Sequence, residues 1–479
     1  MKRIILTLAA FLIVLPQMNA QESVVTGTWL GKLSVGAVEL RIVFNIGVDA
    51  DGILNATMDS PDQGARGIQV GDVTFEDDSL IILAPNLRGD YRGVMVNDTS
   101  LDGTWTQSGM SYKLDLVKQA GEFKLNRPQE PMTPFPYVEE NVKFPSLGGD
   151  FSLAGTLTLP EGEGPYPATI LVSGSGSQNR DEEIFGHKPF KVLADHLTRE
   201  GIAVLRYDDR GVGESGGNPL GATSGDFAMD ARSAIDYLRS REDIDNDMIG
   251  VTGHSEGGLI AFKLASEYDD IAFVVSLAGP GLKGRIILED QTEYISRMNN
   301  LPEEILQQSM TINRKIYGIM EDVEDPETGI QKIEASVRDF YRKEGTDEEI
   351  IDQVMDNLKN SINLASYPWM RYFTRSDPAD YFTGIECPVL ALNGDKDCQV
   401  MAGKNITAIV QGLRDTGNDN VKGKVMPGLN HLFQTADTGL PNEYGEIEET
   451  MSPEVLKIIS EWISGLSTSV RDYHPEPQP

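Results

Sequence analysis

A serine lies at the centre of the glycine-rich stretch G-H-S-E-G-G at residues 253–258. The preceding residues 248–252 are apolar and strand-like, and residues 259–265 have the composition of a buried helix. A tight turn between a strand and a helix exposes a serine hydroxyl, and it needs glycines because a Cβ would clash where the backbone comes so close. We therefore predict that Ser255 is a nucleophile at a helix N-terminus, where developing negative charge is stabilised.

The pattern G-x-S-x-G occurs a second time, at residues 213–217. This second match follows the polar residues 208–212, so no strand leads into it and no helix begins directly after it. Because the pattern has catalytic meaning only between a strand and a helix, the context favours Ser255 and excludes Ser215.

A nucleophilic serine needs a base, and the chain contains five histidines. His431 is the strongest candidate because it follows directly after an expected strand at residues 422–426. His187, at the start of an expected helix, is the alternative. His254 adjoins the serine within the turn, so we expect its side chain to diverge from that of Ser255. His196 lies on a helix before the turn, and His474 lies in the proline-rich tail.

The acid that orients the base is expected at the end of the preceding strand, where two aspartates occur. Asp397 fits the spacing G-x-x-D-x-x-V at residues 394–400 and is preferred, with Asp395 as the alternative. Its carboxylate would hold the tautomer of the imidazole and stabilise the imidazolium that forms during the reaction.

Two N–H donors must face the oxyanion that forms on the substrate. One is the backbone of Glu256, and the other is expected in the loop S-G-S-G-S at residues 173–177, with Ser175 as first choice and Gly176 as second. This loop lacks the Lys-Ser/Thr ending of a phosphate-binding loop, which disfavours nucleotide binding. No zinc-type histidine pair or cysteine cluster occurs, so we expect neither metal nor cofactor.

Strands and helices alternate through the part of the chain that carries these residues, which predicts an α/β domain with a mostly parallel sheet. Residues 138–470 form this expected domain. The alternation stops at residues 282–380, whose helical spacing predicts a lid inserted between two strands. In the lid, Trp369, Tyr372 and Phe373 could line a substrate pocket, or they could pack the lid on the sheet.

The earlier part of the chain has a different pattern. Residues 21–120 contain short alternating segments separated by turn clusters, which predict a small, barrel-like all-β domain. The tripeptide G-T-W at residues 27–29 and 103–105 suggests two edge strands that meet. We expect single strands at residues 68–75 and 112–117, among others. Residues 121–137 contain several prolines and predict a stiff linker, and residues 471–479 a tail.

Residues 1–20 have the pattern of a signal peptide that is cleaved after Ala20: two basic residues, a short apolar run and a small-residue exit. The expected location is therefore the periplasm or the exterior, without stable membrane insertion. The formal net charge of −33 argues against nucleic acid as a partner. Cys387 and Cys398 are expected to be free thiols because a strand between them would hold them too far apart.

Together, these motifs resemble the bacterial carboxylesterases of the α/β-hydrolase superfamily that carry an N-terminal β domain. The resemblance rests on residues 173–181, 207–213, 253–258, 393–400 and 428–434. It implies the α/β-hydrolase fold, Ser255, Asp397 and His431 as the triad, and a small-molecule ester as substrate. Because serine aminopeptidases and prolyl-oligopeptidase-like enzymes are related, amide hydrolysis is the alternative. An inactive ligand-binding envelope protein is a third possibility, and the sequence does not predict the oligomeric state.

Overall fold

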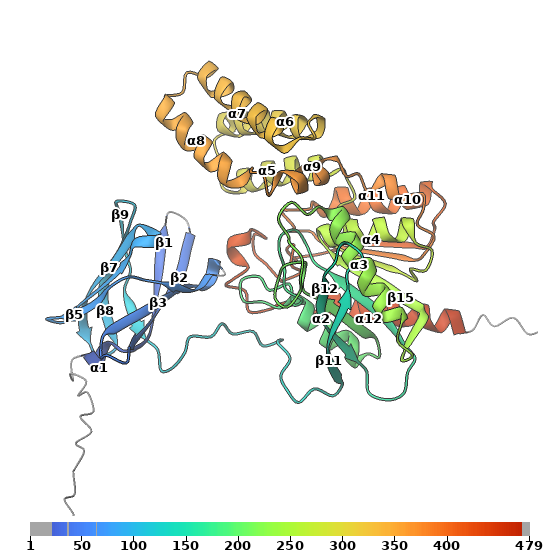
Figure 1. Cartoon of the computed structure of the whole chain (residues 1–479), viewed down its shortest axis with the longest axis horizontal. Helices are drawn as coiled ribbons and strands as arrows, with labels where there is room; N and C mark the ends of the chain where they lie inside the picture. Colours follow the sequence, from blue (N-terminus) through green and yellow to red (C-terminus); the bar gives the residue numbers. More distant parts are fainter. Residues whose placement is uncertain (1–21, 36–37, 64, 472–479) are drawn as a thin grey trace, which may run out of the picture. The chain divides into compact units, whose positions relative to one another are not determined.

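This computed structural model describes residues 22–35, 38–63 and 65–471 (Figure 1). The chain divides between Asn126 and Arg127 into two compact units. The expected signal peptide lies outside the described residues, as does the tail beyond residue 471. Within the described ranges, no helix is both long enough and apolar enough to span a bilayer.

The first unit is a single antiparallel sheet, drawn in blue in Figure 1. A short helix, α1 (Glu22–Val25), precedes it. Its ten strands within the described residues are β1 (Gly27–Val35), β2 (Val38–Val48), β3 (Leu54–Ser60), β4 (Ala65–Gln69), β5 (Val73–Glu76), β6 (Ser79–Ala84), β7 (Gly89–Asn97), β8 (Ser100–Gln107), β9 (Met110–Lys113) and β10 (Leu116–Lys118). The hydrogen-bonded order is β4-β3-β2-β1-β10-β8-β7-β6-β5, with β9 paired to β8. The barrel-like all-β character predicted from the sequence is confirmed.

Two details of the prediction for this unit are wrong. The strands that carry the G-T-W tripeptides, β1 and β8, are central rather than at the edges, because both pair with β10. Their tryptophans, Trp29 and Trp105, lie in the core of the unit together with Tyr91 and Phe44. The single strands expected at residues 68–75 and 112–117 are each broken in two, at β4/β5 and β9/β10. The repeated tripeptide therefore marks two central strands whose tryptophans fill the core.

The second unit is built on an eight-stranded sheet. Its strands within the described residues are β11 (Val138–Pro145), β12 (Ser152–Leu159), β13 (Tyr166–Val172), β14 (Ala203–Tyr207), β15 (Ile244–His254), β16 (Val274–Leu277), β17 (Val389–Gly394) and β18 (Val421–Met426). The order is β11-β12-β14-β13-β15-β16-β17-β18, antiparallel up to β14 and parallel from there onwards. The predicted mostly parallel sheet is confirmed, and it opens with an antiparallel pair, β11 and β12.

Helices cover both faces of this sheet and bury two separate apolar cores (Figure 1). One core lies under α3 (Ser224–Arg239), α4 (Glu256–Glu267) and α11 (Ala402–Asp415). The other lies under α2 (Pro189–Arg199) and α12 (Pro453–Arg471). A parallel sheet that is buried on both faces needs near-continuous apolar strands, and β13, β14 and β16 have them.

The predicted insertion between β16 and β17 is helical. It comprises α5 (Gly284–Met298), α6 (Glu303–Asp322), α7 (Pro326–Lys343), α8 (Glu348–Ser361), α9 (Tyr367–Arg375) and α10 (Ala379–Phe382). Pro302 occupies the N-cap position of α6, the side chain of Asp325 caps α7, and Gly345 follows α7. The insertion has a hydrophobic core of its own, which includes Met320 and Tyr367.

Part of the stretch expected to be a linker packs on the second unit. The guanidinium of Arg127 donates hydrogen bonds to the carbonyl groups of Ile447, Phe185 and Gly445. Gln129 bonds the backbone of Thr450 and Met451. The first residues after the division between the units therefore follow the surface of the α/β unit. Cys387 and Cys398, on either side of β17, are free thiols.

Candidate active site

The turn around Ser255 is a strained junction between β15 and α4. Ser255 has a φ of +51°, a left-handed conformation that is costly for a residue with a side chain. A Cβ on Gly253 would lie 2.0 Å from the carbonyl oxygen of Gly257, and a Cβ on Gly257 would lie 2.1 Å from that of Val172. Both clashes are with backbone, so these two positions require glycine. The local geometry agrees with the expected nucleophile turn.

The sheet brings the loops that carry the other candidates to the same edge. Gly253 pairs with Val172 at the end of β13, and His254 pairs with Leu277 at the end of β16. Further across the sheet, Gly394 at the end of β17 pairs with Met426 at the end of β18. The carboxyl ends of parallel strands, where α/β sheets bind their ligands, therefore meet here.

The structure brings together two of the predicted site residues, Asp397 and His431, from the loops after β17 and β18. Asp397 Oδ2 lies 2.7 Å from His431 Nδ1. The other carboxylate oxygen accepts hydrogen bonds from the N–H groups of Gln399 and Val400, and both side chains of the pair are buried. This arrangement fixes the imidazole with Nδ1 protonated and leaves Nε2 as the basic atom.

The alternative candidates have other partners. Asp395 Oδ1 accepts a hydrogen bond from the N–H of Gly428 at 2.7 Å, so it supports the turn before His431. His187 is buried, with its ring nitrogens 2.9 Å from Thr450 Oγ1 and 2.9 Å from the carbonyl oxygen of Tyr444. Burial, together with the charge of Arg127, lowers the pKa of His187 to about 4. A histidine held neutral in such contacts is a structural residue.

The loop after β13 lies beside the serine. A Cβ on Gly174 would be 3.2 Å from the Cβ of Ser255. Ser175 and Gly176 follow it and are exposed, and the N–H of Glu256 lies in the first turn of α4, where N–H groups lack helical acceptors. The predicted oxyanion donors thus lie on the two segments that border Ser255.

Two buried carboxylates hold this loop. Glu182 accepts a hydrogen bond from the N–H of Gly174 at 2.7 Å. Asp209 accepts one from the N–H of Gln178 at 2.9 Å and one from the hydroxyl of Ser173. Burial raises the pKa of Asp209 to about 8, against the effect of these hydrogen bonds. Glu182 was not singled out in the sequence, and Asp209 entered only as part of residues 207–213 of the resemblance.

Glu182 also contacts the nucleophile turn through His254. His254 Nδ1 lies 2.9 Å from Glu182 Oε1, and its Nε2 lies 3.0 Å from the carbonyl oxygen of His431. As expected, the side chain of His254 therefore has partners other than Ser255. Glu182 directly follows the N-R-D stretch at residues 179–181 that contributed to the sequence resemblance, and this adjacency is the signal that could have identified it.

The side chain of Glu256 joins the nucleophile turn to the helical insertion. Its carboxylate accepts hydrogen bonds from Trp369 Nε1, at 2.9 and 3.0 Å, and from the hydroxyl of Ser224. Burial raises the pKa of Glu256, although both hydrogen bonds oppose the change. The insertion is thus attached to the residue whose N–H is a predicted oxyanion donor.

The three aromatic residues predicted for a pocket or for packing lie on α9. Trp369 is stacked on Phe373 with ring centroids 5.4 Å apart. Phe373 is buried in a cluster with Leu259 of α4, and the Tyr372 ring lies against Gly225 of α3. These contacts are the packing contacts of α9 on the helices of the α/β unit.

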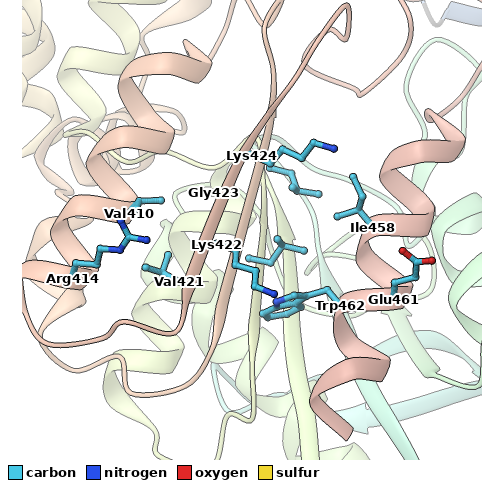
Figure 2. A pocket seen from close by; sticks show the side chains of 11 residues that line it. Val410, Arg414, Val421, Lys422, Gly423, Lys424, Ile458, Glu461 and Trp462 are labelled. Carbon is cyan, nitrogen blue, oxygen red and sulfur yellow. The ribbon is translucent and has the colours of Figure 1, made fainter. Parts of the chain in front are cut away.

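A hollow of about 790 Å³ lies elsewhere, at the open edge of the sheet (Figure 2). It is bordered by β18, α11 and α12, and Arg414, Lys422 and Trp462 are among its lining residues. None of the predicted triad residues lines it. Its lysines lie on the edge strand β18, where lysines commonly protect a sheet against unwanted strand pairing. The hollow is therefore a feature of the sheet edge and is separate from the site at Ser255.

The sheet order, the strained serine between β15 and α4, and the carboxyl-terminal position of the loops define this unit as an α/β-hydrolase. The family described as serine aminopeptidase, S33, matches residues 188–356, which include Ser255. By sequence the chain is a relative of the α/β-hydrolase esterases. The predicted fold class and the predicted resemblance are both confirmed.

Three curated relatives illustrate the relationship. Esterase EstD of Thermotoga maritima is 28% identical over 310 residues, which cover 64% of this chain and 65% of EstD. The putative hydrolase YtaP of Bacillus subtilis is 33% identical over 24% of this chain and 44% of YtaP. The 2,6-dihydropseudooxynicotine hydrolase of Paenarthrobacter nicotinovorans is 31% identical over 30% of this chain and 38% of its own length. The chain therefore spans less than two thirds of each of these relatives.

An esterase of Pyrococcus furiosus is among the solved structures with a similar backbone trace. Its TM-score is 0.41, and it is 16% identical over 72% of this chain and 99% of its own. Est1E of Butyrivibrio proteoclasticus has a TM-score of 0.40 and 15% identity over 68% of this chain and 99% of its own.

Proposed function

We propose that this protein is an exported serine carboxylic-ester hydrolase that works through an acyl-enzyme, with Ser255, His431 and Asp397 as its triad. The observation that carries the proposal is the buried hydrogen bond between Asp397 and His431. It joins two loops at the carboxyl edge of the sheet, beside the strained turn of Ser255. The relationship to esterases supports the same reaction class.

In the proposed reaction, Ser255 Oγ attacks the ester carbonyl carbon while His431 Nε2 takes the hydroxyl proton. The oxyanion receives hydrogen bonds from the N–H of Glu256 and from that of Ser175 or Gly176. The intermediate collapses, the C–O bond breaks, and the alcohol leaves with the proton from His431. Water then attacks the acyl-enzyme with the same base and releases the acid and the free serine.

Amide hydrolysis is the second candidate, because the matching family is described as serine aminopeptidase. An aminopeptidase needs an acidic group that can bind the ammonium of its substrate, and Glu256 is the acid next to the serine. Its oxygens, however, already accept hydrogen bonds from Trp369 and Ser224. Its raised pKa also favours the neutral acid, which binds a cation poorly. The contacts of Glu256 therefore support an ester substrate.

The test is Ser255→Ala, with Ser215→Ala as the matched control from the second G-x-S-x-G stretch. In Ser255→Ala, we expect kcat on short-chain aryl esters to fall by about 10⁶-fold, the size typical of removing a triad serine. Labelling by a fluorophosphonate probe should also be lost. Ser215→Ala should keep both. Labelling that persists in Ser255→Ala would refute the assignment of the nucleophile.

A panel of aminoacyl anilides measured beside the aryl esters separates the two candidates. Higher kcat/KM on the anilides would favour the amide hydrolase. Export is tested separately: the mature protein recovered from the native cell should begin at Gln21, and an N-terminus that retains residues 1–20 would contradict it.

A further inference from the structure

His254 and Glu182 form a second buried histidine–carboxylate pair next to the triad. Glu182 is 4% exposed and His254 is 7% exposed. Glu182 has a φ of +50°, a left-handed conformation, so the backbone is strained where it presents this carboxylate. The His254 and His431 rings lie 4.9 Å apart. The proposed ester mechanism uses neither Glu182 nor the side chain of His254.

The partners of the His254 ring determine how many protons the pair holds. Nε2 faces the carbonyl oxygen of His431, which can only accept, so this nitrogen carries a proton. Nδ1 faces Glu182 Oε1, which already accepts the N–H of Gly174, so a second proton lies between Nδ1 and this oxygen. With this proton on Nδ1 rather than on Glu182, the two groups form an ion pair with no net charge.

The pair connects the segments that the proposed reaction needs. Through Glu182 it holds Gly174, which borders Ser255 and precedes the predicted donors Ser175 and Gly176. Through His254 it holds the backbone of His431, the proposed base. His254 itself is the last residue of β15, directly before the nucleophile. One buried pair thus fixes the oxyanion loop and the histidine loop relative to the serine.

We propose that Glu182 and a doubly protonated His254 act as positioning residues, which hold the oxyanion loop and the His431 loop in register and keep the region beside the oxyanion electrically neutral. The proposal rests on the ester hydrolase function proposed above. Without the proton on His254, the Glu182 carboxylate would be a buried, uncompensated anion bonded to the oxyanion loop. Such a charge opposes the negative charge that develops in the transition state.

The surroundings of His254 agree with this protonation state. Burial opposes a charged imidazole, but the charge and hydrogen bond of Glu182, with smaller contributions from the His431 carbonyl and Asp397, raise the pKa of His254 above its ordinary 6.5. Two further acidic groups border the same segments: Asp209, which holds the same loop, and Glu256, which follows the serine. The charged form is present at low pH and is lost as the pH rises through this raised pKa.

The protonation state can be measured without any substrate, which separates it from the proposed function. The full chain labelled with ¹⁵N-histidine should show one imidazole with both nitrogens protonated at pH 7, and this signal should be absent in His254→Gln. A neutral His254 at pH 7 would overturn the proposal, even if the protein hydrolyses esters.

The positioning role is tested by kcat and KM for an aryl ester in His254→Gln, Glu182→Gln and the double variant. His254→Gln leaves the anion of Glu182 uncompensated, and we expect kcat to fall about 10- to 100-fold with little change in KM. Glu182→Gln keeps an acceptor for Gly174 and removes the charge. Its kcat should fall less than about 5-fold. It should also lack the decline of kcat at alkaline pH that we expect for wild type.

The double variant distinguishes charge from packing. Neutrality is restored in it, so it should recover most of the kcat that His254→Gln loses; a double variant as slow as His254→Gln, or slower, would overturn the proposal. His196→Gln is the matched control, since this histidine bonds Ser460 on the α2 side of the sheet. If wild type shows no Ser255-dependent turnover, the ester function fails, and the NMR result still decides the state of the pair.

Discussion

Ser255 and Ser215 lie in the same G-x-S-x-G pattern, but their hydroxyl groups have different surroundings. Ser215 Oγ donates a hydrogen bond to the carbonyl oxygen of Asp208 at 2.7 Å and accepts one from the N–H of Ala154 at 2.8 Å. Ser255 instead stands at a positive φ between an 11-residue strand and a 12-residue helix. The Ser215 hydroxyl therefore joins β12 to the loop after β14 through two hydrogen bonds. Ser255 lies at the carboxyl edge of the sheet, between β15 and α4.

The glycines of the two turns differ in the same way. In the turn of Ser255, an added Cβ would meet backbone atoms of α4 and β13 at about 2 Å, and closely packed backbone cannot move aside. At Gly213 and Gly217, an added Cβ would meet the side chains of Asp208 and Phe151 at 2.5 and 2.9 Å. The pattern alone thus codes for a tight turn, and the elements on either side decide whether the turn does chemistry.

The largest effect after removal of the nucleophile is expected at Asp397. Asp397→Asn keeps the shape of the side chain but no longer fixes the Nδ1-protonated tautomer of His431. We expect kcat to fall by about 10⁴-fold, the size typical of a lost tautomer control. Steady-state kinetics on an aryl ester measures the change. Asp395→Asn is the matched control and should keep most of the activity, because an amide oxygen can still accept the N–H of Gly428. Equal losses in both variants would contradict the assignment of the acid.

An intermediate effect, on stability alone, is expected at Ser215. Ser215→Ala removes two buried hydrogen bonds and leaves the N–H of Ala154 without its acceptor. We expect the free energy of unfolding to fall by about 1–3 kcal/mol while kcat is retained. Denaturant unfolding followed by far-UV circular dichroism measures the first quantity. A loss of kcat larger than the loss of folded protein would break the distinction between the two turns.

An effect confined to the pH dependence of stability is expected at Asp209, which accepts hydrogen bonds from the oxyanion loop. Its raised pKa of about 8 means that the unfolded chain releases this proton from pH 4 upwards while the folded protein keeps it. Asp209 therefore lowers stability as the pH rises from about 4 to 8. Asp209→Asn should unfold at a higher temperature than wild type at pH 8, with a smaller difference at pH 4. A difference in Tm that does not change with pH would contradict the raised pKa.

Much of the α/β unit could be predicted from the sequence because its strands are continuous apolar runs between periodic helices. The strand before Ser255 and those before Asp397 and His431 were expected at nearly their observed positions. The β unit was less predictable, since its short strands alternate in the same way whether central or at an edge. Only pairing with β10 makes the strands of Trp29 and Trp105 central.

The polar contacts that support the site were not predictable. Glu182 and His254 are 72 residues apart, and Glu256 and Trp369 are 113 apart. Nothing in local periodicity selects one carboxylate among the 74 acidic residues of the chain as the partner of a given donor. Triad candidates could be deduced because their order along a known topology is fixed, whereas the residues that hold them depend on tertiary packing.

The hydrogen bond from Trp369 to Glu256 has a consequence for how this protein could be redesigned. Position 256 contributes its backbone to the proposed oxyanion hole and its side chain to the anchoring of the helical insertion. A library that varies Glu256 to alter selectivity therefore also releases α9, and one that exchanges the insertion leaves a buried acid without its donor. Selectivity and the anchoring of the insertion therefore change together. They can be separated only by replacing residue 256 and the insertion in the same step.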